Sequence, residues 1–284
     1  MKKAFLLMRT CALAASLLAL TGDCGWAAGA SDSPTDAKPI KIKPKTPAVQ
    51  NDSGEGQEGA GLVPGANAPE TNVIDAPTAA VLDYGGYSSQ TRFYSGGGLL
   101  EYVSFGVYHR LNLGASLSVN GLVGNNTTVR VLPPEVQVKY RFYDGDRYLP
   151  GLAVGYDGQG FNYSPTDKLY EDRQRGFYLV ATEELGVPGL EAHPSFNISD
   201  TNTNSIFGSI PLSYNIRDKA TVLFEWDNIS NFGNSRVNSG LRFYLTPKLQ
   251  VDFAVRRIGQ GGFYTDGSSR GPERIVQLKY SSSF

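Results

Sequence analysis

The sequence predicts an all-β protein: a transmembrane antiparallel β-barrel of about twelve strands, with ten as the alternative count. Three observations support this fold class, namely short runs of period-two alternation, connections that alternate in length, and a final strand that ends in an aromatic residue. Gly 33, Tyr 16 and Phe 14 with only 19% charged residues fit a β protein rich in turns and aromatics. Beyond the N-terminus no apolar run reaches the roughly 18 residues of a transmembrane helix, so a helical membrane protein is excluded.

The N-terminal segment 1–30 has the features of a secretory signal peptide. It has a basic start, an apolar run over 11–21, and a small-x-small pattern at 28–30. Asp23 precedes Cys24, which argues against a lipoprotein signal. Both cysteines of the chain lie inside this segment, so we expect the mature protein to have no disulfide and no thiol chemistry.

Residues 31–72 form a zone rich in Pro, Gly and Ser that we expect to be a disordered periplasmic tether, followed by the outer-membrane barrel over 73–284. The lysine and proline residues of 38–47 favour an extended polyproline conformation. Contact with peptidoglycan and service as a solvated spacer are the open alternatives for this tether.

Period-two alternation marks the strands of the barrel. In 248–258, Leu249, Val251 and Phe253 share one face, while Gln250 and Asp252 share the other. Strands are expected at 79–88, 98–108, 113–122, 135–143, 150–160, 176–185, 190–198, 205–215, 219–227, 235–245, 248–258 and 273–284.

The connections between these strands alternate between short and long. Outer-membrane barrels have tight periplasmic turns and longer external loops, so this alternation predicts a bacterial outer-membrane location with both termini in the periplasm. The longest external loops, 161–175 and 259–272, have three open alternatives: they fold into the barrel mouth, bind surface sugar or lipid phosphate, or are mobile.

The polar faces of the strands are expected to line the lumen. A charged interior has two open interpretations, an ion-pair network that fills the barrel or a narrow hydrated channel whose charges tune selectivity. The expected lumen-lining residues are Lys139, Arg141, Asp157, Glu225, Asp227, Arg242, Asp252, Arg256 and Lys279.

The last strand has apolar residues at alternate positions, Val276, Leu278 and Tyr280, and ends in Phe284. This pattern is similar to the assembly signal of outer-membrane barrels. It predicts two partners, the outer-membrane lipid and the machinery that assembles barrels.

Four short segments resemble the YjbH-type family of outer-membrane β-barrels: Val73–Ala79, Gly96–Leu100, Lys139–Arg141 and Leu152–Gly160. The similarity spans roughly 72–284 and places Val73–Ala79 at the opening of the first strand. It implies an outer-membrane location and an association with surface polysaccharide export. It carries over no catalytic residues, and the second domain of larger members is not expected in this chain.

An enzymatic alternative rests on His193 and Ser195, which share a strand face. His-x-Ser on a lipid-facing strand is similar to outer-membrane lipid hydrolases, where the histidine activates the serine. No acid or amide on a neighbouring strand is evident as the third group, and Pro194 is unfavourable inside a strand.

Other chemistry finds no support in the sequence. The mature chain has two histidines and no cysteine, so no metal site is expected, and no cofactor motif is present. The net charge of -1 gives no basic surface for nucleic acid. The sequence therefore favours a non-enzymatic outer-membrane barrel, either a narrow channel or an accessory of polysaccharide export. A lipid hydrolase and a structural envelope anchor are the alternatives.

Overall fold

The computed structural model describes residues 67–124, 128–146, 148–164, 167, 169–172, 176–199, 205–230, 235–264 and 267–283, all within the compact unit Asn51–Phe284. The signal peptide, the tether up to residue 66 and Phe284 therefore lie outside the described residues. Across the described ranges, no helix is long and apolar enough to cross a membrane.

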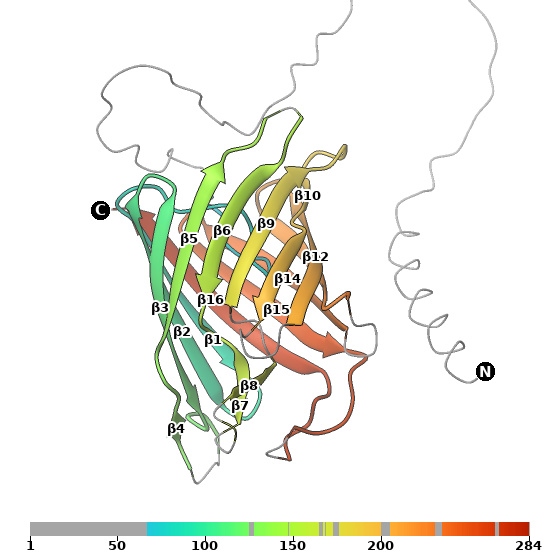
Figure 1. Cartoon of the computed structure of the whole chain (residues 1–284). Helices are drawn as coiled ribbons and strands as arrows, with labels where there is room; N and C mark the ends of the chain where they lie inside the picture. The colour runs from blue at the N-terminus through green and yellow to red at the C-terminus, as the bar shows by residue number, and fades with distance from the viewer. Residues whose placement is uncertain are drawn as a thin grey trace, which may run out of the picture. The chain divides into compact units, whose positions relative to one another are not determined.

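The described chain forms a closed antiparallel barrel (Figure 1), which confirms the predicted fold class. β10 and β11 are two parts of one wall strand and β4 pairs only with β3, so twelve strands make the wall. The barrel closes where β1 pairs with β16, from Gly86 opposite Ser283 to Phe93 opposite Val276. The strands are β1 (Gly86–Tyr94), β2 (Gly98–Tyr108), β3 (Leu111–Asn120), β4 (Arg130–Val131), β5 (Glu135–Tyr143), β6 (Gly151–Asp157), β7 (Phe161–Ser164), β8 (Leu169–Asp172), β9 (Gly176–Glu184), β10 (Leu190–Ala192), β11 (Ser195–Ser199), β12 (Ser205–Ile216), β13 (Ala220–Asp227), β14 (Arg236–Thr246), β15 (Leu249–Ile258) and β16 (Glu273–Ser283).

The two ends of the barrel differ in their connections. At the end where β1 begins and β16 ends, here called the turn rim, the connections are 109–110, 144–150, 185–189, 217–219 and 247–248. The opposite end, here called the loop rim, carries the connections 121–134, 158–175, 200–204, 228–235 and 259–272, most of which are longer. The expected alternation has two exceptions at the loop rim: β1 and β2 are joined by only Ser95, Gly96 and Gly97, and 200–204 is no longer than 185–189 at the turn rim.

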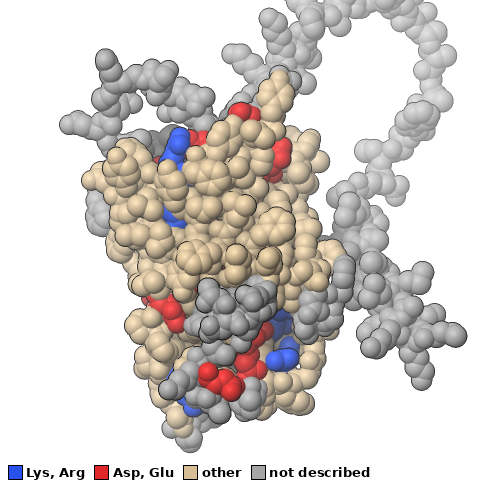
Figure 2. All heavy atoms as spheres, viewed as in Figure 1, with Lys and Arg blue, Asp and Glu red and all other residues tan. Residues whose placement is uncertain are grey.

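The outer surface of the barrel is apolar and the inner surface is polar. Exposure alternates residue by residue along β5 and most of β16, and all the exposed positions except Arg274 are apolar, such as Val138 on β5 and Leu278 on β16. Figure 2 shows this outer side as largely uncharged, with charged side chains gathered toward the rims. Soluble proteins bury their large apolar side chains, so the reversed pattern is that of a wall surrounded by lipid.

The outer surface carries a carboxylate whose two oxygens are satisfied by neighbouring hydroxyls. Glu101 shares its side of β2 with the lipid-facing residues, and its carboxylate accepts hydrogen bonds from the hydroxyls of Ser89 at 2.6 Å and Thr91 at 2.5 Å. These two bonds from β1 satisfy both carboxylate oxygens.

Residues 67–83, here called the plug, do not belong to the wall but fold inside the barrel. The first strand predicted at 79–88 is therefore wrong, and the wall begins at Gly86. The expected tether boundary is also displaced, because 67–72 lie within the lumen. Pro69 and Pro77 have no backbone N–H to donate to a neighbouring strand, which disfavours a wall strand here.

The plug is a hairpin that enters and leaves at the turn rim. Its start is held by a hydrogen bond from the Ala68 N–H to the Pro247 carbonyl at 3.1 Å. Its tip is a turn in which the Val73 N–H donates to the Ala76 carbonyl at 2.9 Å. Its exit passes so close to β2 that a side chain on Gly106 would lie 1.9 Å from the Asp83 carbonyl oxygen, so only glycine fits there.

Candidate functional site

The tip of the plug is bound by one carboxylate of the wall. Glu225 on β13 accepts hydrogen bonds at Oε1 from three consecutive backbone N–H groups, those of Ile74 at 2.6 Å, Asp75 at 2.8 Å and Ala76 at 2.9 Å. The other carboxylate oxygen accepts from Asn238 Nδ2 at 2.8 Å. Hydrogen bonds to a charged acceptor are stronger than neutral ones, so Glu225 fixes the turn at the tip.

Asp75 at the tip lies between two arginines of the wall. Its carboxylate pairs with Arg92 Nη1 on β1 at 2.7 Å and with Arg256 Nε on β15 at 2.6 Å. All three side chains are buried, and Arg256 also pairs with Glu273 at 2.9 Å. The Phe161 ring from the loop rim lies 3.9 Å from the Arg256 guanidinium carbon, so an aromatic ring covers the ion pairs.

The inbound limb of the plug binds β14. Arg242 pairs with Glu70 at 3.0 Å and donates from Nη2 to the carbonyls of Asn72 at 3.2 Å and Val73 at 2.9 Å. Asp252 on β15 accepts two hydrogen bonds from the Arg242 guanidinium, from Nε to Oδ1 at 2.8 Å and from Nη2 to Oδ2 at 2.9 Å. Arg242 therefore connects the plug backbone to the wall through a bidentate pair.

The side of the lumen that holds the plug is here called the charged wall, formed by β13 to β16 and β1. Its buried bases outnumber its buried acids by two, and the plug supplies two acids, Glu70 and Asp75. The plug thus neutralises the excess charge of this wall. The bases are Arg92, Arg236, Arg242, Arg256, Arg257 and Lys279, and the acids are Glu225, Asp227, Asp252 and Glu273.

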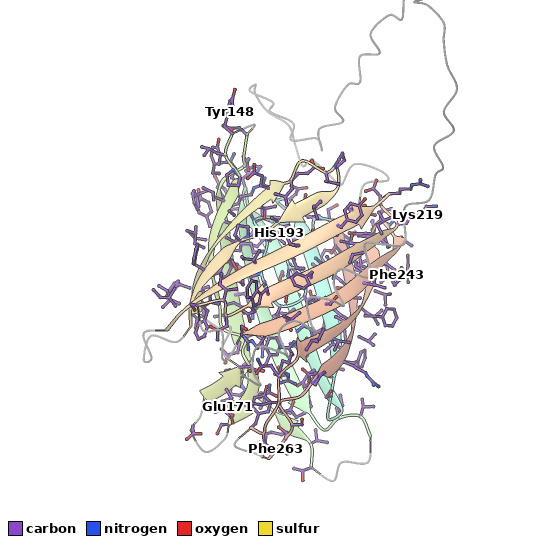
Figure 3. The ribbon with its side chains drawn as sticks, turned by 90° about the vertical axis from the view of Figure 1, so that its right-hand side faces the viewer. Tyr148, Glu171, His193, Lys219, Phe243 and Phe263 are labelled. Carbon is purple, nitrogen blue, oxygen red and sulfur yellow. The ribbon has the colours of Figure 1, made fainter. Side chains whose placement is uncertain are left out.

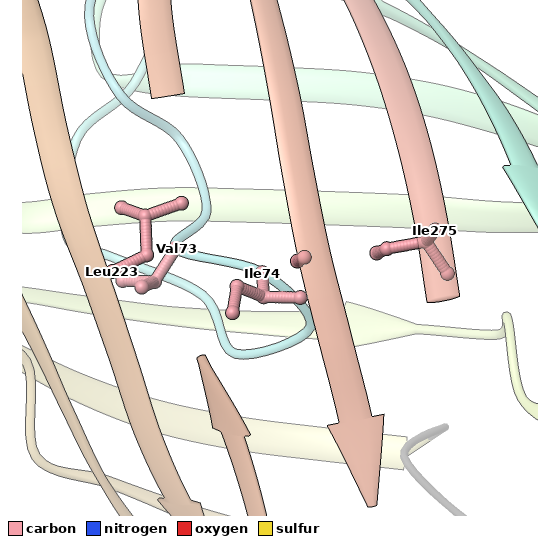
Figure 4. Close-up of a cluster of buried hydrophobic side chains, with 5 residues drawn as sticks. Val73, Ile74, Leu223 and Ile275 are labelled. Atoms are coloured by element: carbon pink, nitrogen blue, oxygen red, sulfur yellow. The ribbon is translucent and has the colours of Figure 1, made fainter. Parts of the chain in front are cut away.

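A small apolar cluster lies beside these ion pairs (Figure 4). Val73 and Ile74 of the plug tip pack with Leu223, Ala254 and Ile275, which point inward from β13, β15 and β16. Apolar residues on the inner face of a barrel would otherwise contact water. Their position under the tip indicates that the wall is shaped to receive the plug.

The opposite side of the lumen, here called the amide wall, is formed by β2, β3, β5, β6, β9 and β11 and named for Asn112, Gln137 and Asn197. It contacts the plug more lightly. The Lys139 ammonium donates to the carbonyls of Thr71 at 2.6 Å and Ala80 at 3.3 Å.

Thr182 on β9 marks where the outbound limb meets the amide wall. The Ala79 N–H donates to Thr182 Oγ1 at 2.8 Å, and Thr182 Oγ1 lies 3.0 Å from His193 Nδ1. His193 Nε2 lies 3.0 Å from Ser213 Oγ on β12. His193 is thus part of a hydrogen-bonded chain inside the barrel (Figure 3).

The expected lipid-facing position of His193 and Ser195 is wrong. Ser195 lies on β11 and His193 in the break between β10 and β11, and both are buried inside the barrel, where His193 is 1% exposed and Ser195 is 4% exposed. Ser195 Oγ lies 2.5 Å from Ser209 Oγ rather than beside the histidine ring. Phe196 and Ile198, next to them on β11, face outward instead, because side chains alternate along a strand.

The loop rim is covered by parts of the two longest loops. β7 and β8 form a hairpin, and Tyr170 on β8 is buried. Asp172 accepts a hydrogen bond from the Tyr264 hydroxyl at 2.6 Å and pairs with Arg236 and Arg257 at 3.2 and 3.1 Å. The described parts of 161–175 and 259–272 are therefore joined to each other and fold over the barrel mouth.

The electrostatics of Asp172 follow from these neighbours. Burial alone would raise the pKa of its carboxyl, but Arg236, the Tyr264 hydroxyl and the other arginines together hold the pKa below its ordinary value. Asp172 therefore remains a carboxylate at neutral pH.

The expected lumen residues fall into three places. The first group binds the plug directly and consists of Glu225, Arg242, Arg256, Lys139 and Lys279. Lys279 donates to the carbonyl of Pro69 at 3.4 Å and to Thr71 Oγ1 at 3.2 Å. Asp252 holds Arg242, Asp227 pairs with Arg236 near the loop rim, and Asp157 accepts from the Gln159 N–H. Arg141 lies at the turn rim, where it pairs with Asp144 at 3.2 Å.

Several residues of the site were missed from the sequence. Asp75 lay before the first predicted strand, Glu70 lay in the expected tether, and Arg92 lay in an assumed loop. The signal that points to Asp75 is a single acid in the apolar run 73–82, since a buried carboxylate requires a cationic partner. On the outer face, Val276, Leu278 and Tyr280 are each about two-fifths exposed.

The closed wall, apolar exterior and polar interior define a transmembrane β-barrel of the outer-membrane kind. No protein-family model matches the chain, and no curated protein matches it. Among solved structures, the KdgM porin in complex with disordered oligogalacturonate is similar, with a TM-score of 0.41 and 9% identity over 70% of this chain and 99% of that one. The NanC porin has a TM-score of 0.37 and 13% identity over 70% and 99%. A mutant of the Rh. blastica porin has a TM-score of 0.33 and 11% identity over 65% and 55%. At these identities the likeness concerns the fold alone.

Proposed function

We propose that this protein is a non-enzymatic outer-membrane barrel that provides a narrow aqueous pore, closed by its own residues 67–83. The observation that carries the proposal is the placement of Asp75 between Arg92 and Arg256. Plug and wall meet through ion pairs and hydrogen bonds beside the apolar cluster at the tip, and these polar groups are able to hydrate when the two surfaces part. A polar lumen wall is what an aqueous pore requires.

In this proposal the turn rim faces the periplasm and the plug opens toward that side. Both limbs of the hairpin end at the turn rim, while the loop rim is covered by Phe161, Asp172 and Tyr264. Withdrawal at the turn rim needs no movement of that cover. The association with polysaccharide export implied by the YjbH-type resemblance stays a prediction about cargo.

Single-channel conductance of the refolded mature protein in a planar bilayer tests the proposal. We expect the wild type to be closed for most of the record and Asp75→Asn to open far more often, because it removes the charge that both arginines bind. Asp157→Asn is the matched control, since Asp157 binds no plug residue in the described chain. Heat-modifiable gel mobility shows that each variant has folded.

The opposing outcome favours a different function. If Asp75→Asn folds and stays as silent as the wild type, the barrel is a closed anchor and the channel proposal fails. The anchor alternative has its own support, because the plug fastens the chain that precedes residue 67 to the inside of the barrel. A lipid hydrolase has no such support, since His193 and Ser195 contact other residues inside the lumen.

A further inference from the structure

The loop-rim cover, which consists of the described parts of 161–172 and 259–272, contacts the residues that hold the plug. The centre of the Phe161 ring lies 3.9 Å from the guanidinium carbon of Arg256 and 5.4 Å from that of Arg92. These are the two arginines that bind the carboxylate at the plug tip. The cover therefore lies directly over the ion pairs of the plug.

A chain of ion pairs also joins the plug tip to the cover. Arg256 pairs with Asp75 at 2.6 Å and with Glu273 on β16 at 2.9 Å. Glu273 also pairs with Arg257 at 3.1 Å, and Arg257 pairs with Asp172 on β8 at 3.1 Å. The five side chains are at most 13% exposed. Buried acids and bases thus alternate from the plug to the loop rim.

A bulge in the wall places Arg257 in this chain. Side chains alternate along a strand, so the residue after the inward-facing Arg256 is expected to face lipid. Instead, both arginines of β15 lie opposite the single residue Asn238 of β14, and Arg257 is buried with a φ of 56°. A left-handed backbone is unfavourable for a residue other than glycine, so surrounding contacts must hold it. Regular strand pairing is interrupted where the wall joins the plug to the cover.

The same bulge contacts the carboxylate that binds the backbone of the plug tip. Asn238 Oδ1 accepts from the Arg257 N–H at 2.9 Å, and Asn238 Nδ2 donates to Glu225 Oε2 at 2.8 Å. Glu225 binds the Ile74 N–H through its other oxygen. The plug tip is therefore connected to Arg257 by two separate routes.

Burial makes the plug and the cover stabilise each other. If the plug leaves while the cover is closed, Arg92 and Arg256 stay buried under Phe161 without their shared carboxylate, which is strongly unfavourable. If the cover lifts as well, both guanidinium groups are hydrated and the penalty falls. The closed cover thus stabilises the docked plug, and by reciprocity the docked plug stabilises the closed cover to the same extent.

We propose that the loop-rim cover and the plug dock cooperatively, so that lifting the cover weakens the docked plug and releasing the plug loosens the cover. This coupling goes beyond the proposed pore, because it is present whether or not the barrel conducts. The plug withdraws at the turn rim without passing the cover, so the link between them is energetic and not steric. Contacts made at one rim of the barrel thereby control a segment that moves at the other.

Amide hydrogen exchange of the full mature chain in lipid nanodiscs tests the coupling. It is measured at the N–H groups of Val73 and Ile74, which are hydrogen-bonded in the docked tip. Asp172→Asn removes the charge that pairs with Arg257 at the loop rim. We expect exchange at the tip to accelerate roughly fivefold or more, the lower end of couplings between linked sites. Asp144→Asn is the matched control, since it removes an ion-paired carboxylate at the turn rim, and exchange at the tip should not change.

Limited proteolysis of the cover measures the coupling from the other end. Asp75→Asn should raise cleavage at 161–172 by a similar factor, because the coupling free energy is the same in both directions. In the double variant of Asp75→Asn and Asp172→Asn, exchange at Ile74 should be slower than the product of the two single effects predicts. Tyr264→Phe removes a hydroxyl that donates to Asp172, and it is the milder variant if Asp172→Asn does not fold.

Heat-modifiable gel mobility shows that each variant has folded. A cover that is cleaved faster in Asp172→Asn while exchange at the plug tip is unchanged would overturn the coupling. Single effects that simply multiply in the double variant, or equal acceleration in Asp144→Asn, would overturn it as well. None of these outcomes alters the conductance expected of Asp75→Asn, so the coupling and the channel are rejected by different results.

Discussion

The two sides of the lumen differ in how their polar groups are used. On the charged wall, Arg92, Arg242 and Arg256 all bind acids or carbonyls of the plug. On the amide wall, Asn112 and Gln137 keep acceptors without a partner among the described residues, and a cavity remains beside them. The difference indicates a division of roles, in which the charged wall holds the plug and the amide wall contacts it more lightly.

Because the ion pairs of the charged wall are buried, removing one of their partners costs more free energy than removing a neutral hydrogen bond on the amide wall. Removing one partner of a buried ion pair leaves the other charge without compensation, which costs about 3–5 kcal/mol, whereas a neutral buried hydrogen bond contributes about 1 kcal/mol. Equivalent substitutions on the two walls should therefore differ widely in their effect on the plug.

The largest effect is expected for Asp75→Asn, compared with Asp157→Asn on the amide wall. The first leaves Arg92 and Arg256 without their shared carboxylate, at a cost of about 3–5 kcal/mol to plug docking. Amide hydrogen exchange at 73–79 should accelerate roughly a hundredfold or more in Asp75→Asn and hardly change in Asp157→Asn. Equal acceleration of exchange in both variants would contradict the claim that the charged wall holds the plug more strongly than the amide wall does.

Glu225→Gln should have the next largest effect. The amide oxygen can still accept from the plug tip, but the charge that strengthens three hydrogen bonds is lost, so we expect about 1.5–3 kcal/mol. The same exchange experiment measures it, and Glu101→Gln is the control because Glu101 bonds only to hydroxyls on the outer face. Unchanged protection at Ile74 in Glu225→Gln would contradict the role of Glu225.

Acid should loosen the loop-rim cover. The folded pKa of Asp172 lies below its unfolded value of 3.8, so its contribution is complete above that pH and is lost as the pH falls through the folded pKa. Proteolysis at 161–172 between pH 5 and 2.5, about the range that brackets this value, should increase at the acidic end. In Asp172→Asn the cover should be loose at every pH, and an unchanged acid profile in that variant would refute the assignment.

The smallest effects on stability are expected for substitutions of His193 and Ser195, the residues of the hydrolase alternative. Ser195→Ala and His193→Ala should each lower stability by about 0.5–1.5 kcal/mol through lost hydrogen bonds inside the lumen. Lipid hydrolysis by the pure protein should be at background level and identical in wild type and both variants. Hydrolysis that disappears in Ser195→Ala would reinstate the hydrolase.

Most of the wall could be predicted from the sequence because alternation is a local property. The ranges 98–108 and 135–143 coincide with β2 and β5 at both ends. The inward position of Glu225 and Arg242 follows from the same parity. Parity therefore predicts that these side chains point inward, but it does not predict what they bind inside the barrel.

The plug could not be predicted in this way because most of the contacts that hold it to the wall join residues far apart in the sequence. Val73–Ala79 has the apolar composition of a strand, and only Asp75 and Pro77 distinguish it. Its carboxylate meets Arg256 across 181 residues, and no local pattern encodes that pairing. The segment that resembles the opening strand of YjbH-type barrels is therefore the tip of the plug.

Oxidative cross-linking of a Val73→Cys, Leu223→Cys double variant tests most directly whether the plug occupies the charged side of the lumen. Val73 and Leu223 are fully buried in one cluster. Cys11 and Cys24 are replaced by serine so that no other thiol reacts. We predict near-complete cross-linking in the heat-modifiable, folded barrel, and none for Val73→Cys paired with Val180→Cys on the amide wall. A folded barrel in which position 73 fails to link to position 223, or links equally to position 180, would contradict the placement of the plug against the charged wall.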